Sequence, residues 1–169
     1  ELEIALVQQK KNYAIGRIIK ILKPSPDRTT PKCPLFSQCG GCQWQHISYP
    51  AQLKYKRQLV TDSLERIGKI TGTNIAETIG MDDPWHYRNK VQYPVAWERG
   101  QTIIGYYQER THRVINVTEC PVAHPDLTLL MNITRNIIRK YRLYVYNESL
   151  GKGLLRHVIG RIGFATVLG

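Results

Sequence analysis

Apolar residues alternate with polar ones at the start of the chain, over residues 2–7. A second strand-like run covers residues 14–22, and the polar residues 10–12 between the two runs suit a turn. A lone hairpin is only marginally stable in water. We therefore expect these two strands to belong to a larger sheet or barrel.

Residues 24–51 lack a regular apolar pattern and predict a linker followed by a loop. Pro24, Pro26 and Pro31 fall within a short polar stretch, where they exclude a helix or a central strand. Three of the four cysteines of the chain follow within ten residues.

Helical spacing marks two later segments. In residues 52–69 the apolar face consists of Leu53, Val60, Leu64 and Ile67, and Gly68 ends the run. In the second helix, from about Asp126 to Tyr141, the predicted buried residues are Leu130, Ile133, Ile137 and Tyr141. An acidic residue at its start and basic residues at its end match the helix dipole.

Four short strand-like runs before the second helix predict an antiparallel meander, and two more follow the helix. These strand-like runs are residues 75–79, 90–97, 102–107, 113–117, 154–162 and 164–168, with a turn at residues 98–100. The predicted fold class is α+β, with two helices and an antiparallel sheet in a central domain over residues 70–169.

The charge of the chain points to a polyanion as partner. There are 24 basic and 13 acidic residues, which leave a net charge of +11. Residues 135–169 carry +6, whereas residues 70–134 carry −2, so the positive charge flanks a mildly acidic middle. A basic protein with a merely solvated surface is the alternative.

No run is long and apolar enough to span a membrane, and residues 1–4 lack the features of a secretory signal. We therefore expect a cytoplasmic protein without a membrane partner.

The four cysteines suggest a metal centre. Cys33, Cys39 and Cys42 form the pattern C-x5-C-G-G-C, and Cys120 follows far downstream before a proline. Four thiolates can bind a soft metal ion or a 4Fe-4S cubane. Without a secretory signal, disulfides are disfavoured. Structural zinc sites usually show two close cysteine pairs, but spacing alone leaves zinc and iron–sulfur as equal alternatives.

Residues 28–46, with Tyr49, Gln52, Leu53 and Lys56, resemble the cluster segment of the TRAM-containing uracil-5 RNA methyltransferases. The resemblance continues in the same order through residues 87–90, 104–107, 120–121 and 155–158, so it covers nearly the whole chain. It implies that Cys33, Cys39, Cys42 and Cys120 hold a 4Fe-4S cluster, which can be lost or replaced by zinc in air.

The same resemblance divides the chain into four parts. Residues 1–23 would be the last strands of a TRAM domain, a small oligonucleotide-binding barrel, and residues 24–51 the linker and iron–sulfur loop. The helix of residues 52–69 would pack on a methyltransferase domain that is missing here, and residues 70–169 would be the central domain. Both ends then suggest a fragment, whose catalytic domain would begin beyond Gly169.

The resemblance implies an S-adenosylmethionine-dependent enzyme that makes 5-methyluridine, with 23S ribosomal RNA as the favoured substrate and transfer RNA as the alternative. That family uses a cysteine nucleophile, and all four cysteines here fit the cluster pattern. We expect this chain alone to be inactive, with S-adenosylmethionine bound in the missing domain. A non-catalytic iron–sulfur or zinc RNA-binding module is the other alternative. An iron–sulfur electron carrier would not account for the charge.

Basic and aromatic side chains near these motifs are candidate RNA contacts in a monomeric protein. The candidates are Arg17, Lys20, Lys23, Arg28, Trp44, His46, Tyr49, Arg88, Lys90, Arg156 and Arg161. Any one of them alone is better explained as a surface or packing residue, so the prediction rests on the whole set.

Overall fold

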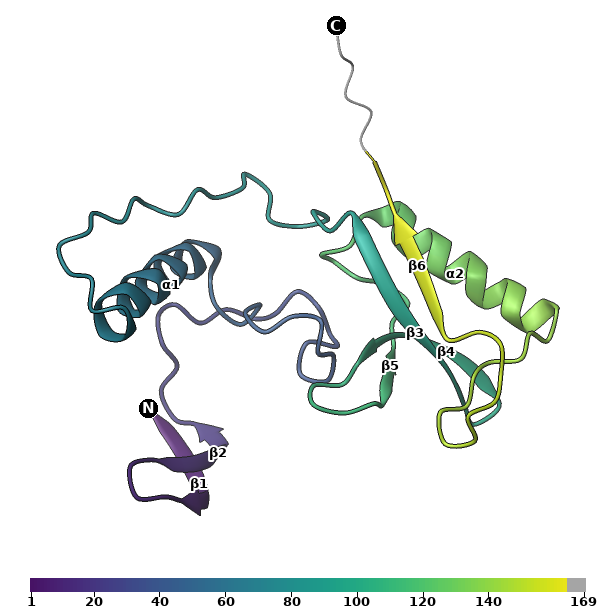
Figure 1. The fold of residues 1–169 in the computed structure, drawn as a ribbon, viewed down its shortest axis with the longest axis horizontal. Helices are drawn as coiled ribbons and strands as arrows, with labels where there is room; N and C mark the ends of the chain where they lie inside the picture. Colours follow the sequence, from purple (N-terminus) through teal and green to yellow (C-terminus); the bar gives the residue numbers. More distant parts are fainter. Residues whose placement is uncertain (164–169) are drawn as a thin grey trace, which may run out of the picture.

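The computed structural model describes residues 1–163 of the chain and confirms the α+β class, with all strand pairs in its sheets antiparallel (Figure 1). A hairpin is formed by β1 (Leu2–Gln9) and β2 (Ala14–Ile21). The second sheet has the order β5-β4-β3-β6 and consists of β3 (Lys90–Glu98), β4 (Gln101–Tyr107), β5 (Val114–Asn116) and β6 (His157–Arg161). The predicted turn between β3 and β4 is confirmed, with positive φ at Arg99 and Gly100.

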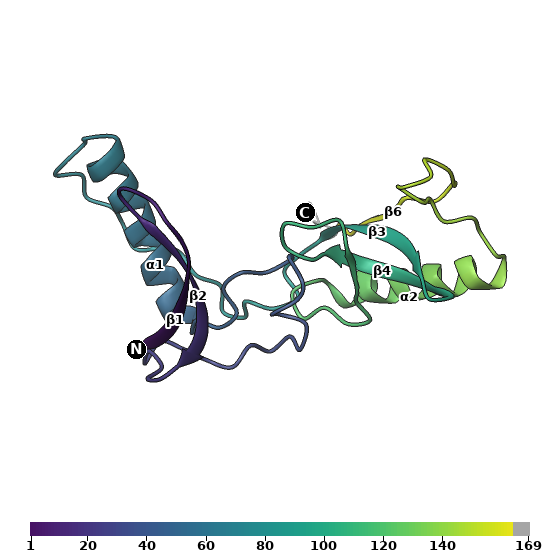
Figure 2. The same cartoon turned by 90° about the horizontal axis from the view of Figure 1, so that it is seen from below.

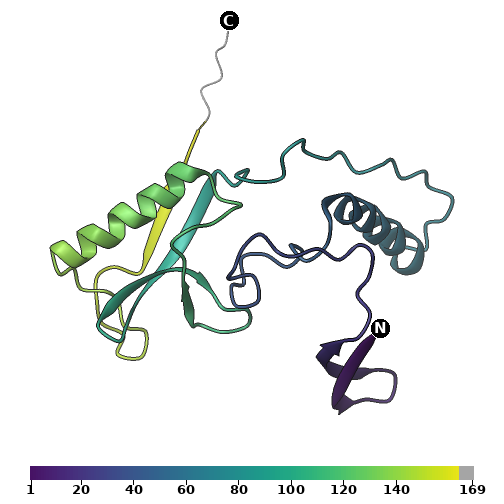
Figure 3. The same ribbon diagram turned by 180° about the vertical axis from the view of Figure 1, so that it is seen from behind.

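Helix α2 (Pro125–Lys140) lies along one face of the four-stranded sheet, and the core lies between them (Figures 1 and 3). The fully buried side chains there include Tyr93 and Ile104 from the sheet and Leu127, Met131 and Ile138 from the helix. Burial of these large apolar groups stabilises this part of the fold.

The predicted buried face of α2 was wrong. Leu130, Ile133, Ile137 and Tyr141 are 39–63% exposed, whereas Leu127, Met131 and Ile138 are buried. Apolar residues cover more than one face of this helix, so periodicity could not select the face that meets the sheet. Gly160 of β6 helps to set the contact, because a Cβ there would lie 2.8 Å from Leu127.

Helix α1 (Tyr49–Asp62) continues into a π-helical turn, η1 (Ser63–Ile67), which confirms the first predicted helix with an earlier start. The predicted strand at residues 75–79 is wrong. This segment is an extended strap, and Thr78 donates a hydrogen bond of 2.9 Å to the carbonyl of Leu53 in α1. Apolar and polar residues alternate in this segment, but no strand of residues 1–163 pairs with it.

The hairpin and α1 lie at one end of the molecule, and the four-stranded sheet with α2 lies at the other (Figures 1 and 2). Among residues 1–163 no further strand joins the hairpin, so its assignment to a barrel stays a prediction. The strand expected at residues 154–162 is shorter, as β6, and that at 164–168 lies outside the described residues. Within the described chain, no helix is long and apolar enough to cross a membrane.

Candidate metal centre

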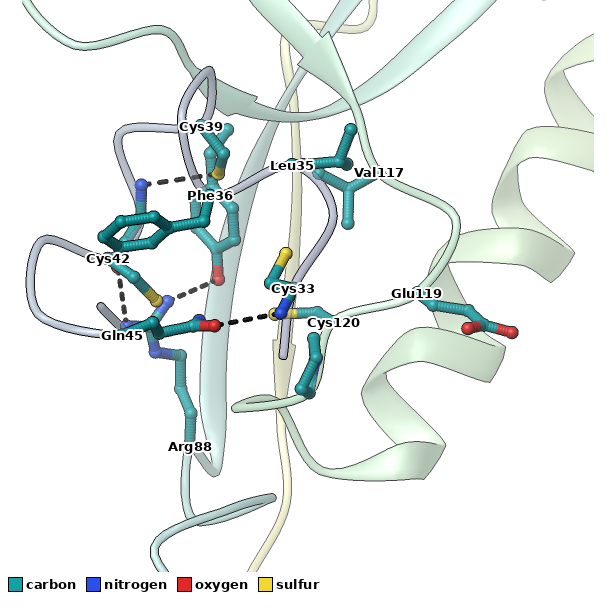
Figure 4. A pocket seen from close by; sticks show the side chains of 13 residues that line it. Cys33, Leu35, Phe36, Cys39, Cys42, Gln45, Arg88, Val117, Glu119 and Cys120 are labelled. Carbon is teal, nitrogen blue, oxygen red and sulfur yellow. Dashed lines mark hydrogen bonds between the residues drawn. The ribbon is translucent and has the colours of Figure 1, made fainter. Parts of the chain in front are cut away.

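The four cysteines line one cavity, although Cys120 is far from the other three in sequence (Figure 4). Cys33, Cys39 and Cys42 come from the loop before α1, and Cys120 from the segment between β5 and α2. None of them forms a disulfide. Leu35, Phe36, Tyr106, Val117 and Pro121 also line this cavity, so its surroundings are largely apolar.

The loop that carries Cys39 and Cys42 is fixed to the end of β4 by its backbone. The amide of Gly40 donates a 2.9 Å hydrogen bond to the carbonyl of Tyr107, and Cys39 bridges to Gln108. A Cβ on Gly40 would lie 2.8 Å from that same carbonyl oxygen. Glycine is therefore required here for close approach of two backbones.

Cys33 is positioned from the other end of the same loop. Its amide donates a 3.0 Å hydrogen bond to Oε1 of Gln45, and its carbonyl accepts one of 3.2 Å from Phe36. Leu35 then packs against the core of the sheet and α2. The loop is thus fastened both to itself and to the central domain.

Cys120 reaches the cavity because its segment pairs with the residues that precede β3. Arg88 and Ala123 form a parallel bridge, in which the amide of Arg88 donates a 2.8 Å hydrogen bond to the carbonyl of Val122. His86 donates its own amide to Pro121 at 2.9 Å. These bonds place Cys120 opposite the cysteine loop.

Arg88 joins the two sides of the cavity. Its Nη1 donates to the hydroxyl of Tyr106 at 2.9 Å, and its Nη2 donates to the carbonyl of Gly41 at 3.2 Å. Burial acts to lower the pKa of Arg88, but the hydrogen bond and attraction to Tyr106, with a further contribution from Cys42, raise it overall. A permanent cation therefore stands beside Cys42, at the edge of the cysteine cavity.

Burial raises the pKa of both Cys33 and Cys39, and electrostatic repulsion from the neighbouring thiols adds to the effect. For Cys39 all three other cysteines contribute, so the four thiols form one electrostatic group. A metal that binds thiolates must overcome this preference for the neutral thiol by displacing protons.

The donor set fits a soft metal centre by its chemistry, since it consists of four thiols. The cavity is narrow, about 20 Å³ in volume. Across residues 1–163, no three side chains of Cys, His, Asp or Glu lie close enough together to share one metal ion. The assignment of the four cysteines as cluster ligands stays a prediction.

A larger open groove of about 360 Å³ adjoins this cavity and shares Gly41, Cys42 and Arg88 with it. It contains three of the predicted RNA contacts, Trp44, Tyr49 and Arg88. The hydroxyl of Tyr49 is already engaged, because it accepts a 2.7 Å hydrogen bond from the amide of Met81.

The other predicted RNA contacts lie outside this groove. Arg17 and Lys20 are exposed on β2, with Lys23 beyond its end, and Arg28 is exposed in the linker. His46 packs against Phe36, with ring centroids 5.5 Å apart. Lys90 faces Arg161 across β3 and β6, and Arg156 lies over the ring of Tyr146 at 4.1 Å. Their role in RNA binding stays a prediction.

Sequence comparison identifies close relatives along nearly the whole chain, although no family model matches it. An uncharacterized RNA methyltransferase of Halalkalibacterium halodurans is 46% identical over 165 residues, and one of Clostridium acetobutylicum is 42% identical over 163. The chain is thus similar to RNA methyltransferases over nearly its whole length. The match with the Halalkalibacterium relative covers 98% of this chain but only 36% of the relative, so the chain corresponds to about a third of such a methyltransferase.

The fold agrees with this similarity. The crystal structure of Pyrococcus abyssi tRNA (uracil-54, C5)-methyltransferase in complex with S-adenosyl-L-homocysteine matches 96% of this chain, with a TM-score of 0.66 and 21% identity. The match covers 36% of that methyltransferase. At this identity the likeness bears on the fold alone.

Four residues that line the groove were not predicted from the sequence, namely Lys32, Lys56, Trp85 and Tyr87. Trp85 and Tyr87 lie just before Arg88 in the chain, and Lys32 precedes Cys33. Proximity in sequence to the predicted metal ligands and to Arg88 was the available signal for three of them.

Proposed function

We propose that this chain is the iron–sulfur and RNA-binding part of an S-adenosylmethionine-dependent RNA (uracil-5-)-methyltransferase. The convergence of Cys33, Cys39, Cys42 and Cys120 on one cavity is the observation that carries the proposal. Similarity to RNA methyltransferases supports the reaction class.

In this proposal Cys33, Cys39, Cys42 and Cys120 would hold a 4Fe-4S cluster. The cluster supplies a covalent cross-link between the loop before α1 and the segment before α2, together with a centre capable of one-electron chemistry. Closing so long a chain segment restricts the unfolded state and stabilises the folded one. Arg88, which donates a hydrogen bond to the carbonyl of Gly41 in the loop, would offset part of the negative charge of a bound cluster.

The chain itself would bind RNA but would not transfer methyl groups. Addition at carbon 6 of uracil requires a nucleophile, and the chain has only the four cysteines assigned to the metal centre. S-adenosylmethionine and the catalytic cysteine would then belong to a part of the protein outside residues 1–169.

The favoured substrate is 23S ribosomal RNA, with transfer RNA as the second candidate, in a cytoplasmic and monomeric enzyme. The Pyrococcus abyssi protein acts on tRNA, as its description states, but that likeness concerns the fold. The net charge of +11 suits either RNA equally.

Methyl transfer from labelled S-adenosylmethionine tests this function. The protein that carries this sequence would be incubated with 23S ribosomal RNA and with transfer RNA, and the digested nucleosides would be separated. We expect labelled 5-methyluridine from ribosomal RNA and no label with residues 1–169 alone. Label in another nucleoside would contradict the uracil-5 assignment, and label in transfer RNA alone would select the second candidate.

A non-catalytic RNA-binding module with zinc or an iron–sulfur cluster is the competing function. It predicts RNA binding without any labelled nucleoside, whichever RNA is offered. The net positive charge supports RNA binding in both cases, so only the transfer assay separates them.

A further inference from the structure

The groove beside the cysteine cavity combines flat rings with positive charges. Trp44, Tyr49, Trp85 and Tyr87 all line it, and they come from the cysteine loop, the start of α1 and the segment before β3. Trp44 and Trp85 are half-buried, so part of each residue remains accessible. Aromatic faces of this kind are the surfaces on which unpaired bases stack.

Three cations line the same groove. Lys32 lies with its Nζ 4.7 Å from the ring centroid of Trp85, which is within the range of a cation–π interaction. Lys56 projects from α1, and Arg88 is fixed by its hydrogen bonds to Tyr106 and Gly41. Of the described residues that line the groove, none is Asp or Glu. The groove therefore suits an anionic ligand that also carries a flat ring.

The backbone around Trp85 is fastened independently of any ligand. Its amide donates a 3.2 Å hydrogen bond to Oδ1 of Asp83, and the next residue, His86, is tied to Pro121. The backbone that carries the ring is thus placed before a ligand arrives, which reduces the entropy lost on binding.

We propose that this groove binds one unpaired nucleotide of a single-stranded RNA, with its base against Trp85 and its phosphates near Lys32 and Lys56. The proposal rests on the proposed function, since RNA is there the polyanion. A groove of about 360 Å³ has the size of a small-ligand site. A duplex keeps its base faces stacked inside the helix, so it cannot offer them to Trp85.

The test compares two ligands of equal charge on the whole chain, purified without oxygen. One is a short uridine oligonucleotide, and the other is a ribose-phosphate oligomer of the same length without bases. We expect the chain to bind the uridine oligonucleotide more tightly. Trp85→Ala should weaken that binding about tenfold and leave the base-free oligomer nearly unaffected, because only stacking is lost.

Matched variants separate stacking from folding. Trp85→Phe keeps an aromatic face and should retain most of the affinity. Trp97, which is 60% exposed at the end of β3 and outside the groove, provides Trp97→Ala as the control without effect. The Lys32→Ala, Lys56→Ala double variant should weaken both oligomers alike, since it removes charge. Iron content and thermal unfolding show whether each variant is folded.

The outcomes distinguish this proposal from the proposed function. If the chain binds the uridine oligonucleotide and Trp85→Ala binds it equally well, the groove assignment is overturned while RNA binding stands. If the unchanged chain binds both oligomers with equal affinity, the groove binds only the phosphates. That result would also overturn the proposal that a base stacks on Trp85. If the chain binds no RNA even at low salt, the proposed RNA-binding function itself fails.

Discussion

The cysteine cavity and the open groove beside it share Gly41, Cys42 and Arg88, yet the residues of each are held in place in different ways. Around the cavity, a backbone hydrogen bond joins the cysteine loop to β4, and the amide of Cys33 donates to the side chain of Gln45 at the far end of the loop. In the groove, exposed side chains such as Lys32 and Tyr87 project from segments that are fastened elsewhere.

We therefore expect substitutions in the cavity to affect folding and substitutions in the groove to affect ligand binding. A change in the cavity alters backbone packing, so it should affect both metal content and stability. A change at the groove surface removes a contact with a ligand, and surface substitutions usually change stability by about 0.5 kcal/mol or less. Each variant below could contradict this separation between effects on folding in the cavity and effects on binding in the groove.

Loss of a cysteine should have the largest effect. Cys120→Ser removes the ligand that joins the segment before α2 to the loop, so we expect iron to fall from about four per chain to nearly none. Metal analysis of the anaerobic protein measures this. Ser37→Ala, an exposed change in the same loop, should keep its iron. Full iron content in Cys120→Ser would remove Cys120 from the ligand set.

Gly40→Ala should come next, because its Cβ would lie 2.8 Å from the carbonyl oxygen of Tyr107. The backbone must shift to relieve this overlap, at a cost of about 1–3 kcal/mol in the free energy of unfolding. Urea unfolding gives the value. Gly163→Ala is the matched control and should be neutral, since no atom of the described residues lies within 4 Å of a methyl group placed there. Equal stability of the two variants would refute the close-packed account of the loop.

Arg88→Lys keeps the charge but cannot reproduce the fork that joins Tyr106 and Gly41. We expect a loss of about 1 kcal/mol in the free energy of unfolding, because a hydrogen bond to a half-buried group is lost. Arg110→Lys, at a side chain that is 90% exposed, should change nothing. An unchanged stability of the Arg88→Lys protein, combined with weaker RNA binding, would assign Arg88 to the groove alone.

The smallest effect is expected from the pair Lys90 and Arg161, which face each other across β3 and β6. Like charges opposite each other on a sheet are mildly destabilising, so changing both to Gln should raise stability slightly. If both contact phosphates, RNA affinity should fall and the salt dependence should flatten by about one unit per contact. Salt titration of RNA binding measures the affinity and its salt dependence. An unaltered slope would make this pair a solvated surface feature.

The difference between the cavity and the groove also explains which residues of the site could be predicted from the sequence. Cysteine is rare in this chain, and its spacing nominated all four cavity thiols, although spacing could not choose between zinc and iron–sulfur. Their convergence depends on the bridge between Arg88 and Ala123, which joins segments far apart in sequence. The prediction of iron–sulfur rather than zinc rests on the resemblance to a family, because spacing alone could not decide between them.

The groove was harder to predict because its residues are common and come from several segments. Trp85 gains its place through a hydrogen bond to Asp83 and through the pairing of His86 with Pro121, which no local pattern encodes. Prediction of the fold from the sequence was limited in the same way. Both helices and strands β3 and β4 follow from periodicity, but the buried face of α2 depends on the sheet it meets.

We propose that Cys33, Cys39, Cys42 and Cys120 hold one 4Fe-4S cluster. Iron, sulfide and zinc should be measured in the same anaerobically purified sample, together with its visible absorption. We predict a brown protein with about four irons and four sulfides per chain, and little zinc. A colourless anaerobic protein with one zinc per chain would contradict the claim.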